Sequence, residues 1–600
     1  MMNARVVSVV GVVCLGFILG CGTDTIVVET PDVAAAGDRV HPKLVVTSPV
    51  SGTFATTPEV TIEGTLEVGS APVELTINGD LVPVTDGAFA HTVTLRSGPN
   101  LIGLRADAED RGRAVGAVTV YGPRVYEPGE MIYEAMLVHL GQAFLDNDTA
   151  ELDDVAGILQ ALLQDDEFLE SFFEEPYEIG EDSELWVEHV FLSDVSIDLE
   201  AGPACLTTEI ILGDARGQGG TVEIDLLATG SGALLGELIM LRAERVRIAA
   251  LICPEVGVQG LDFEILDPAV NFTGFALSTE EYPDLAEEMP AVNDALATIA
   301  ESALASWIGN SLSDLLLELI ADLATTYVFG EAPEITAQFS LEDAQVHSGG
   351  LVLEYGVRFS TPPGLEGLPA HIGSPRTIDP GLPLAFSDAP IAVALSDDAL
   401  NQILFSSWYG GGVSAFEFPP EALEALPEIF QPITSFEIDL VVPPAFVLPR
   451  EEEDFAYDLA VGALPMRILA DQDRYFDMEI HFQAGVGVEL DEEGLLAMAI
   501  DNRAQRILVL AAVHEAPEVH DPGDIAALLR MMVPSILGEM NVTMPGFPIP
   551  SLDLSLFSEG LSGFQGRELT LIPEGLRRGG DGGGYLIVEG GIGEVEITAD

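Results

Sequence analysis

Lysine is almost absent from this chain. Lys43 is the only lysine, and the 23 basic residues stand against 99 acidic ones, which gives a formal net charge of −76. Such a surface repels nucleic acids and anionic lipid headgroups. The composition therefore excludes nucleic acid as a partner. It suits solubility at high ionic strength, where salt shortens the range of self-repulsion.

The signatures of common enzyme classes are also missing. The sequence has no Gly-x-Ser-x-Gly elbow, His-Glu-x-x-His pair, phosphate-binding glycine loop or Cys-x-x-Cys pair. Pro517 lies between His514 and His520, so the two histidines cannot pair simply on a helix, and we expect a solvated acidic loop there. The acidic run from Asp146 to Asp154 lacks the glycine of a calcium loop and predicts a helix end. We expect no catalytic residue, no cofactor and no metal.

Cysteine is scarce, and two of the four cysteines lie at the N-terminus. Arg5 precedes an apolar run, Val6 to Leu19, that is shorter than the ~20 residues of a membrane-spanning helix. This pattern predicts a secretory signal peptide over residues 1–20. Ile18-Leu19-Gly20-Cys21 resembles the lipobox of bacterial lipoproteins. We therefore expect a lipid anchor on Cys21 and a place in the cell envelope, at the outer membrane, with the leaflet left open.

The remaining cysteines, Cys205 and Cys253, lie in a part of the chain that export would place in an oxidising compartment. We predict that they form a disulfide. Closing this loop stabilises a fold by about 4 kcal/mol in the chain-entropy model. Two separate buried thiols are the alternative.

The composition of the N-terminal region changes twice along the chain. Residues 21–43 are polar and predict a tether. Residues 44–124 alternate in short apolar stretches separated by turn signals such as Asn78-Gly79 and Asp86-Gly87. The pattern predicts a small β-sandwich that resembles the immunoglobulin-like modules of bacterial surface proteins. We expect it to serve as a stiff spacer.

The rest of the chain mixes strands with a few amphipathic helices, which predicts an α+β class. Tyr133 to Phe144 and Val292 to Leu323 have helical spacing of apolar residues. A helix is also predicted over Asp397 to Tyr409, with Ser396 as its N-cap and glycines at its end, and another over Asp524 to Met540, kinked at Pro534. Alternating stretches between these helices predict strands, among them Thr221 to Leu227, Val246 to Ile252 and Ile391 to Leu395.

Two stretches resemble the bactericidal/permeability-increasing protein family. Ile391 to Phe405 is similar to the opening of that family's C-terminal barrel, where a strand enters a helix through a Leu-Ser turn. Met532-Val533-Pro534-Ser535-Ile536-Leu537, with Gly546 to Pro550 behind it, is similar to the family's proline-kinked late helix. The order of elements upstream resembles its N-terminal barrel and linker. The strong acidity and the position of Cys205 and Cys253 depart from the family.

The resemblance implies two elongated antiparallel sheet-plus-helix barrels in tandem, over residues 125–375 and 376–600, with apolar tunnels for a phospholipid or other acyl lipid. The apolar helix faces would line the tunnels, although each of these residues also suits an ordinary core. These candidate lipid-binding residues are Leu137, Leu140, Phe144, Leu304, Trp307, Ile308, Leu312, Leu400, Leu404, Trp408, Leu528, Met532 and Ile536. We expect a membrane-anchored lipoprotein that binds or transfers lipid. A structural or adhesion lipoprotein with solid barrels is the alternative.

Overall fold

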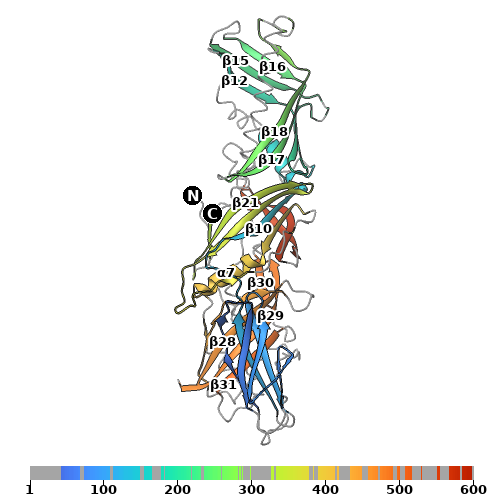
Figure 1. Ribbon diagram of the computed structural model, residues 1–600. Coiled ribbons are helices and arrows are strands. Elements are labelled where there is room, and N and C mark those ends of the chain that lie inside the picture. The colour runs from blue at the N-terminus through green and yellow to red at the C-terminus, as the bar shows by residue number, and fades with distance from the viewer. Residues whose placement is uncertain are drawn as a thin grey trace, which may run out of the picture.

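The structure is a computed structural model of the 600-residue chain. It describes residues 42–67, 73–108, 112–148, 154–164, 177–180, 183–215, 217, 219–230, 236–257, 260–281, 283–284, 287, 298, 326–329, 333–376, 383, 389–412, 415–417, 433–448, 457–470, 473–490, 496–500, 507–515, 529, 551–553, 567–580 and 584–596. These residues form an elongated body of antiparallel sheets, with a small β-sandwich against one end (Figure 1).

The N-terminal region is a β-sandwich, as its sequence predicts. Its burial alternates along the strands because one face of each sheet meets the core, where Ile62, Ile77 and Ile102 lie. Asn78 and Gly79 both adopt positive φ in the turn after β4, which is the role expected of an Asn-Gly pair. One sheet consists of β1 (Lys43–Ser48), β3 (Glu59–Glu67) and β6 (Ala88–Thr94). The other consists of β2 (Thr53–Phe54), β8 (Gly112–Tyr121), β7 (Pro99–Ala108), β4 (Val73–Ile77) and β5 (Asp80–Val82).

The end of the body farthest from the sandwich, the N-lobe, holds two sheets (Figure 1). The five-stranded sheet runs β11 (Tyr177–Gly180), β12 (Ser183–Leu192), β15 (Val222–Gly230), β16 (Leu238–Ala243) and β19 (Ala276–Ser278). The four-stranded sheet runs β13 (Val195–Ala201), β14 (Leu206–Gly213), β17 (Arg245–Gly257) and β18 (Gly260–Thr273). Cys205 and Cys253 form a disulfide that joins the start of β14 to β17, with Cα atoms 4.3 Å apart.

An eight-stranded sheet occupies the middle of the body and joins the two halves of the chain. Its order is β20 (Thr326–Phe329), β21 (Ile335–His347), β22 (Gly350–Ser360), β10 (Ile132–Gly141), β24 (Ile391–Ser396), β34 (Tyr585–Glu596), β33 (Arg567–Gly579) and β32 (Ser551–Asp553). β10 from the first half pairs with β24 from the second, and β24 pairs with the C-terminal β34. The halves are therefore connected by one continuous ladder rather than by a linker alone.

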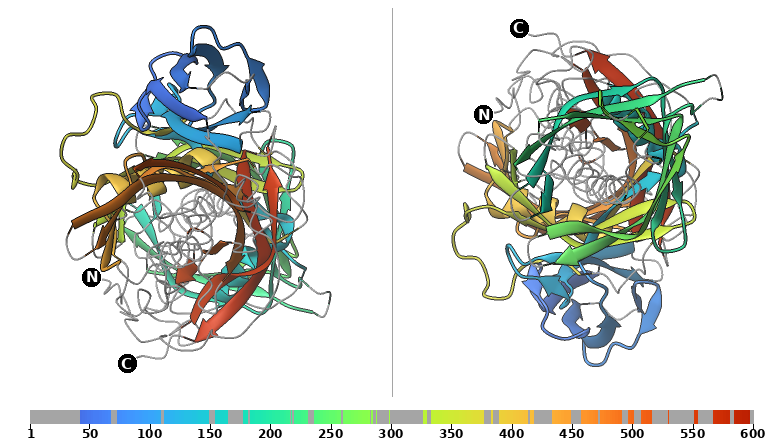
Figure 2. Two further views of the ribbon diagram at one scale, coloured as in Figure 1. Left: turned by 90° about the horizontal axis from the view of Figure 1, so that it is seen from below. Right: turned by 90° about the horizontal axis from the view of Figure 1, so that it is seen from above.

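The other end, the C-lobe, is a seven-stranded sheet. Its strands are β25 (Ala415–Glu417), β26 (Ser435–Asp439), β28 (Tyr457–Ala470), β29 (Asp473–Leu490) and β30 (Leu496–Ile500), with β27 (Ala445–Val447) paired to β28 and β31 (Ile507–Glu515) paired to β29. The segment between β22 and β24, which we call the crossover, contains β23 (Ser374–Pro375), and β23 forms a two-stranded sheet with β9 (Val125–Tyr126). Viewed along the body, the strands of the lobes curve around a common axis (Figure 2).

Three helices are described: α1 (Gln142–Leu145), α2 (Val155–Leu163) and α7 (Asp397–Tyr409). The predicted helix over Asp397 to Tyr409 is confirmed, and the Ser396 hydroxyl accepts a hydrogen bond from the Ala399 N–H at 3.2 Å. The predicted helices over Val292 to Leu323 and Asp524 to Met540 lie outside the described residues, apart from Thr298 and Leu529.

The predicted helix over Tyr133 to Phe144 is wrong. Residues 132–141 form β10, and only the four residues of α1 continue as a helix. From Ala135 to Gly141, β10 is buried on both faces inside the eight-stranded sheet, so this part of its sequence is almost entirely apolar instead of alternating. Such a run cannot be distinguished from a buried helix by spacing alone.

The sandwich does not extend away from the body as a spacer. It lies against the C-lobe, where β8 faces β28 and β31 (Figure 1). Tyr121 packs there with Val442 and Ala463, and all three are buried. Gly462 allows the close approach, because a Cβ at this position would meet the side chain of Thr119.

Candidate functional site

The interior of the N-lobe is apolar on several sides. Leu199, Leu206 and Ile248 come from three neighbouring strands of the four-stranded sheet and are buried. α2 packs on β13 of that sheet, and seven of its nine residues are buried. A helix that is apolar almost all round belongs inside a core rather than on a surface.

Two of the candidate lipid-binding residues reach this interior. Leu140 at the end of β10 and Phe144 in α1 are buried in the same apolar core as α2. Leu137, predicted to share their face, lies on the other side of the sheet with Ala392 and Ile587. Leu137 was placed by helical spacing, whereas odd and even positions of a strand face opposite ways.

The centre of the molecule is organised by α7. Leu400, Leu404 and Trp408 are buried and join the same apolar core, as their helical spacing predicts. The Trp408 indole N–H donates to the Leu440 carbonyl at 2.7 Å, which ties the helix to the C-lobe. The Gln402 side chain connects it to the central sheet, because the Phe359 N–H donates to Oε1 at 2.7 Å.

An ion pair between the buried Asp397 and the partly buried Arg578 fixes the start of α7. The Arg578 guanidinium donates two hydrogen bonds to the Asp397 carboxylate, at 2.6 and 2.7 Å. The Tyr457 hydroxyl donates to the same carboxylate at 2.9 Å, and the Arg578 guanidinium stacks over the Tyr457 ring. Burial of Tyr457, and then the Asp397 charge, raise the pKa of its hydroxyl, so it stays neutral. These groups satisfy one another, so the arrangement is structural.

Five described candidates thus reach one apolar core, and Leu137 does not. Neither of the cavities described below is lined by any of these six residues. The other candidates, together with the predicted lipid anchor, lie outside the described residues: Cys21, Leu304, Trp307, Ile308, Leu312, Leu528, Met532 and Ile536. Leu529, beside Leu528, is described and buried in the common core.

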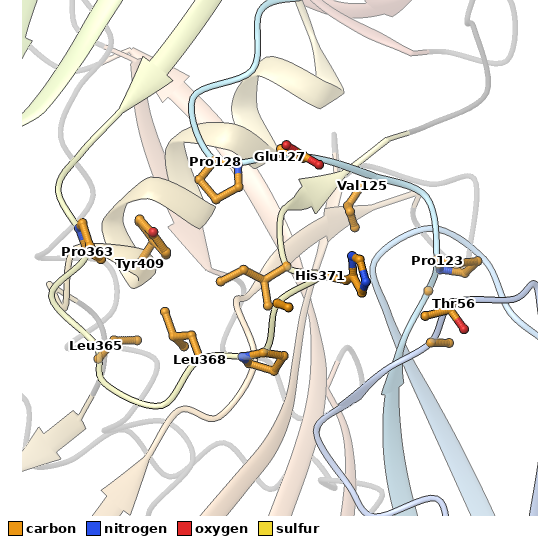
Figure 3. Close-up of a pocket in the computed structure, with 15 residues that line it drawn as sticks. Thr56, Pro123, Val125, Glu127, Pro128, Pro363, Leu365, Leu368, His371 and Tyr409 are labelled. Carbon is orange, nitrogen blue, oxygen red and sulfur yellow. The ribbon is translucent and has the colours of Figure 1, made fainter.

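A cavity of about 640 Å³ lies where the sandwich, the crossover and the end of α7 meet (Figure 3). Leu365, Leu368 and Ile372 form its apolar part. Tyr409 and His371 lie on opposite sides of it. A smaller cavity of about 150 Å³ is its neighbour and shares Tyr409. This site was not predicted from the sequence, because its lining comes from segments as far apart in the chain as Thr56 and Tyr409.

Ionisable groups cluster on the central sheet. Burial, followed by the charge of Glu134, raises the pKa of Glu354 to about 7. His139 stacks on His347 with ring centroids 5.3 Å apart. Burial and the neighbouring His347 lower the pKa of His139 to about 4, so the ring is neutral at pH 7. A neutral imidazole suits a buried position.

The two described ends of the acidic run lie at helix ends, since Asp146 follows α1 and Asp154 is the N-cap of α2. The two carboxylate oxygens of Asp154 accept from the N–H groups of Gly157 and Asn147, and Asp146 accepts from those of Asp148 and Leu199. These carboxylates are thus used by the backbone. Among the described residues, no group of three histidine, cysteine or acidic side chains is placed to hold a metal ion. The same residues contain no helix with the length and apolar content to cross a bilayer.

Comparison with known proteins identifies the sandwich more clearly than the body. Residues 42–121 match the family model of glucodextranase, domain B, which agrees with an immunoglobulin-like all-β domain formed by β1 to β8. No curated protein matches the chain.

Three solved structures resemble the chain at low identity. The crystal structure of lipopolysaccharide binding protein is 13% identical with a TM-score of 0.38, and the match covers 77% of this chain and 99% of that one. P47 of Clostridium botulinum E1 is 7% identical with a TM-score of 0.23, covering 77% and 100%. SGBP-B of Bacteroides ovatus, in complex with a mixed-linkage heptasaccharide, is 10% identical with a TM-score of 0.12, covering 41% and 71%. Similarities of this size define neither the architecture of the body nor a ligand.

Proposed function

We propose that this protein is an exported lipoprotein that binds or transfers a phospholipid or another acyl lipid inside its body. The lipid chain of Cys21 would hold it at a membrane of the cell envelope, at the outer membrane, with residues 21–43 as the tether. The tandem-barrel form of the body belongs to the same proposal. No covalent chemistry is part of it.

One observation carries this proposal: a single apolar core extends through both lobes. It includes Ile210 in the N-lobe, Leu353 in the central sheet, Trp408 in α7 and Phe482 in the C-lobe. Single cores usually stop growing at about 250–300 residues, beyond which chains divide into separate domains. A core continuous along an elongated body is the environment that a long acyl chain requires, at ~25 cal/mol per Å² of buried apolar surface.

Charge narrows the lipid class. The net charge of −76 would repel an anionic headgroup at the entrance to the core. A zwitterionic or neutral lipid avoids this cost, because only its chains need to enter. We therefore expect phosphatidylcholine, phosphatidylethanolamine or a neutral acyl lipid rather than a cardiolipin-like one.

The test uses soluble protein carrying Cys21→Ser. Its organic extract is measured by mass spectrometry before and after incubation with phosphatidylcholine vesicles. We expect about one or two lipids per chain, since each lobe offers one apolar interior. A folded protein whose extract stays clean after incubation would contradict the proposal.

A matched pair of variants locates the lipid. Ala228 and Thr229 are neighbours on β15, and Ala228 is buried toward the N-lobe interior while Thr229 lies on the opposite face. Ala228→Phe fills interior space, so bound lipid should fall by roughly half if each lobe holds one. Thr229→Phe should leave it unchanged. Equal lipid in both variants would place the lipid outside the N-lobe.

A second function, surface binding with solid lobes, is favoured by the cavity at the sandwich. Its volume of about 640 Å³ falls in the range of small-molecule sites, and its two sides come from domains that are packed together. A clean lipid extract, combined with a ligand that binds the parent but not a Tyr409→Ala variant, would support this function instead.

A further inference from the structure

The tip of the N-lobe exposes large apolar side chains on a sheet face. Trp186 and Phe191 in β12 are 37% and 46% exposed, and Leu238 in β16 is 42% exposed. All three belong to the five-stranded sheet at the far end of the body (Figure 1). We call the set of Trp186, Phe191, Leu227 and Leu238 the tip patch.

The strand register places the tip patch on one face. Trp186 lies opposite Leu227, and Leu227 lies opposite Leu238, which forms a row across three strands. Phe191 lies opposite Glu223, on the same face of β15 as Leu227. The other face carries Val190, Leu226 and Leu241, which are buried.

A β-bulge is what brings both aromatic residues to the outside. Trp186 and Phe191 are five positions apart, so a regular strand would direct them to opposite faces. The register shifts between Val187 and His189, where Glu188 is the extra residue. Bulges re-aim side chains in this way. The bulge exposes an aromatic ring that a regular strand would direct inward. The tip patch therefore results from a specific irregularity of β12.

The charges around the tip patch are mainly negative. Glu184 and Glu188 are exposed on β12, and Glu223 and Asp225 lie on the outward face of β15. Arg242 lies opposite Glu223 on this face, with its Nε 3.4 Å from the Glu223 carboxylate. An apolar centre with an acidic rim is complementary to an apolar surface with a basic rim.

This charge pattern excludes two simple occupants. A second copy would bring the same acidic rim against itself, at a net charge of −76 per chain. An anionic bilayer would be repelled for the same reason. We propose that the tip patch docks a cationic amphipathic segment of a partner protein, with apolar side chains against Trp186 and Leu238 and basic side chains against the glutamates. The inference does not depend on lipid binding.

The test uses full-length protein with Cys21→Ser and two synthetic amphipathic helical peptides. The peptides share one apolar face, and their polar faces carry only lysine or only glutamate. Binding is measured by fluorescence anisotropy at 0.15 and 0.5 M salt, and hydrogen exchange locates the contact. We expect the lysine peptide to bind and to protect β12, β15 and β16.

Variants separate docking from general attraction to an acidic protein. The double variant Trp186→Ser, Leu238→Ser should weaken binding of the lysine peptide by on the order of tenfold, because it removes a tryptophan, one of the residues that contribute most to binding energy, together with its apolar neighbour in the row. Val328→Ser with Ile572→Ser is the control, since both residues are exposed apolar side chains on other strands. Glu184→Gln with Glu188→Gln should weaken binding by roughly threefold at 0.15 M salt and less at 0.5 M.

Three results would overturn the proposal: no binding of the lysine peptide, equal loss in the patch and control variants, or equal binding of both peptides. Phosphatidylcholine vesicles that protect β12, β15 and β16, when the peptide does not, would assign the tip patch to a lipid surface instead. Lipid content of the core should be the same in all variants, so failure here is distinct from failure of the lipid-binding proposal.

Discussion

The two ends of the body differ in whether the outer face of their sheet is covered or exposed to solvent. At the C-lobe the outer face is covered by the sandwich, and the residues in contact are small or hydrogen-bonded: Gly462, Ala463 and His481. At the N-lobe tip the outer face is open and carries Trp186 and Phe191 inside an acidic rim. Covered faces are shaped for close approach, whereas open faces that keep large apolar side chains are typical of interaction surfaces.

The covered end also contains a buried polar contact. His481 is fully buried, and its Nδ1 accepts from the Ala463 N–H at 3.1 Å, so the Thr119 hydroxyl, 2.6 Å away, donates to the same nitrogen. The proton then lies on Nε2, which is 3.3 Å from the Glu479 carboxylate. This buried contact links β8 of the sandwich directly to β28 and β29 of the C-lobe.

The largest loss of stability is expected from a substitution in the middle of the body, because the central sheet is connected to both lobes. Arg578→Met would leave the buried Asp397 carboxylate without its cation and should cost about 3 kcal/mol of unfolding free energy. Hydrogen exchange should accelerate in both lobes. Arg467→Met, which removes an exposed pair with Glu437, is the control and should cost less than about 1 kcal/mol. Acceleration confined to one lobe would show that the ends are independent.

Gly462→Ala should disrupt the contact between the sandwich and the C-lobe and leave the N-lobe unchanged. The added Cβ would collide with the Thr119 side chain, which should cost about 2 kcal/mol. Limited proteolysis should then cut between the sandwich and the C-lobe. Gly575→Ala is a suitable control, because nothing lies within 4 Å of a Cβ at that position. Undisturbed docking in Gly462→Ala would mean that the contact is loose.

A smaller effect, which depends on pH, is expected from the half-buried carboxyl group of Glu354 in the central sheet. Because the pKa of Glu354 is raised from 4.5 to about 7, folding favours its protonated form. Its contribution to stability is therefore present at low pH and is lost as pH rises from about 4.5 through about 7. Urea unfolding of Glu354→Gln should match the parent near pH 4 and exceed it near pH 8. The same pH profile in both proteins would rule out this assignment.

The smallest effect on stability is expected at the open end. Trp186→Ser removes a ring that is 37% exposed on an outer sheet face, so we expect a loss of about 1 kcal/mol in unfolding free energy, smaller than at the two buried sites above. Thermal melting of the parent and variant checks this. A large loss would show that Trp186 supports the fold and would weaken its role in docking.

The sequence predicted features that depend on neighbours in the chain. The sandwich strands, the cap and length of α7 and the disulfide between Cys205 and Cys253 all follow from local pattern or from a small set of cysteines. The spacing of α7 also placed Leu400, Leu404 and Trp408 correctly in the core.

What the sequence did not predict depends on burial or on distant segments. β10 was mistaken for a helix because both of its faces are covered, and Leu137 was therefore assigned to the wrong side. The cavity of about 640 Å³ is lined by residues as distant in the chain as Thr56 and Tyr409, and no local pattern connects them. The exposure of Phe191 depends on a one-residue bulge, which shifts the face without changing composition.

The most direct test of lipid binding is a crystal structure of the Cys21→Ser protein with a brominated phosphatidylcholine. The account predicts anomalous bromine peaks inside the body, against the apolar core that contains Leu353 and Trp408. Bromine found only in the cavity beside Tyr409, or an apolar core filled by protein side chains with no bromine, would contradict it.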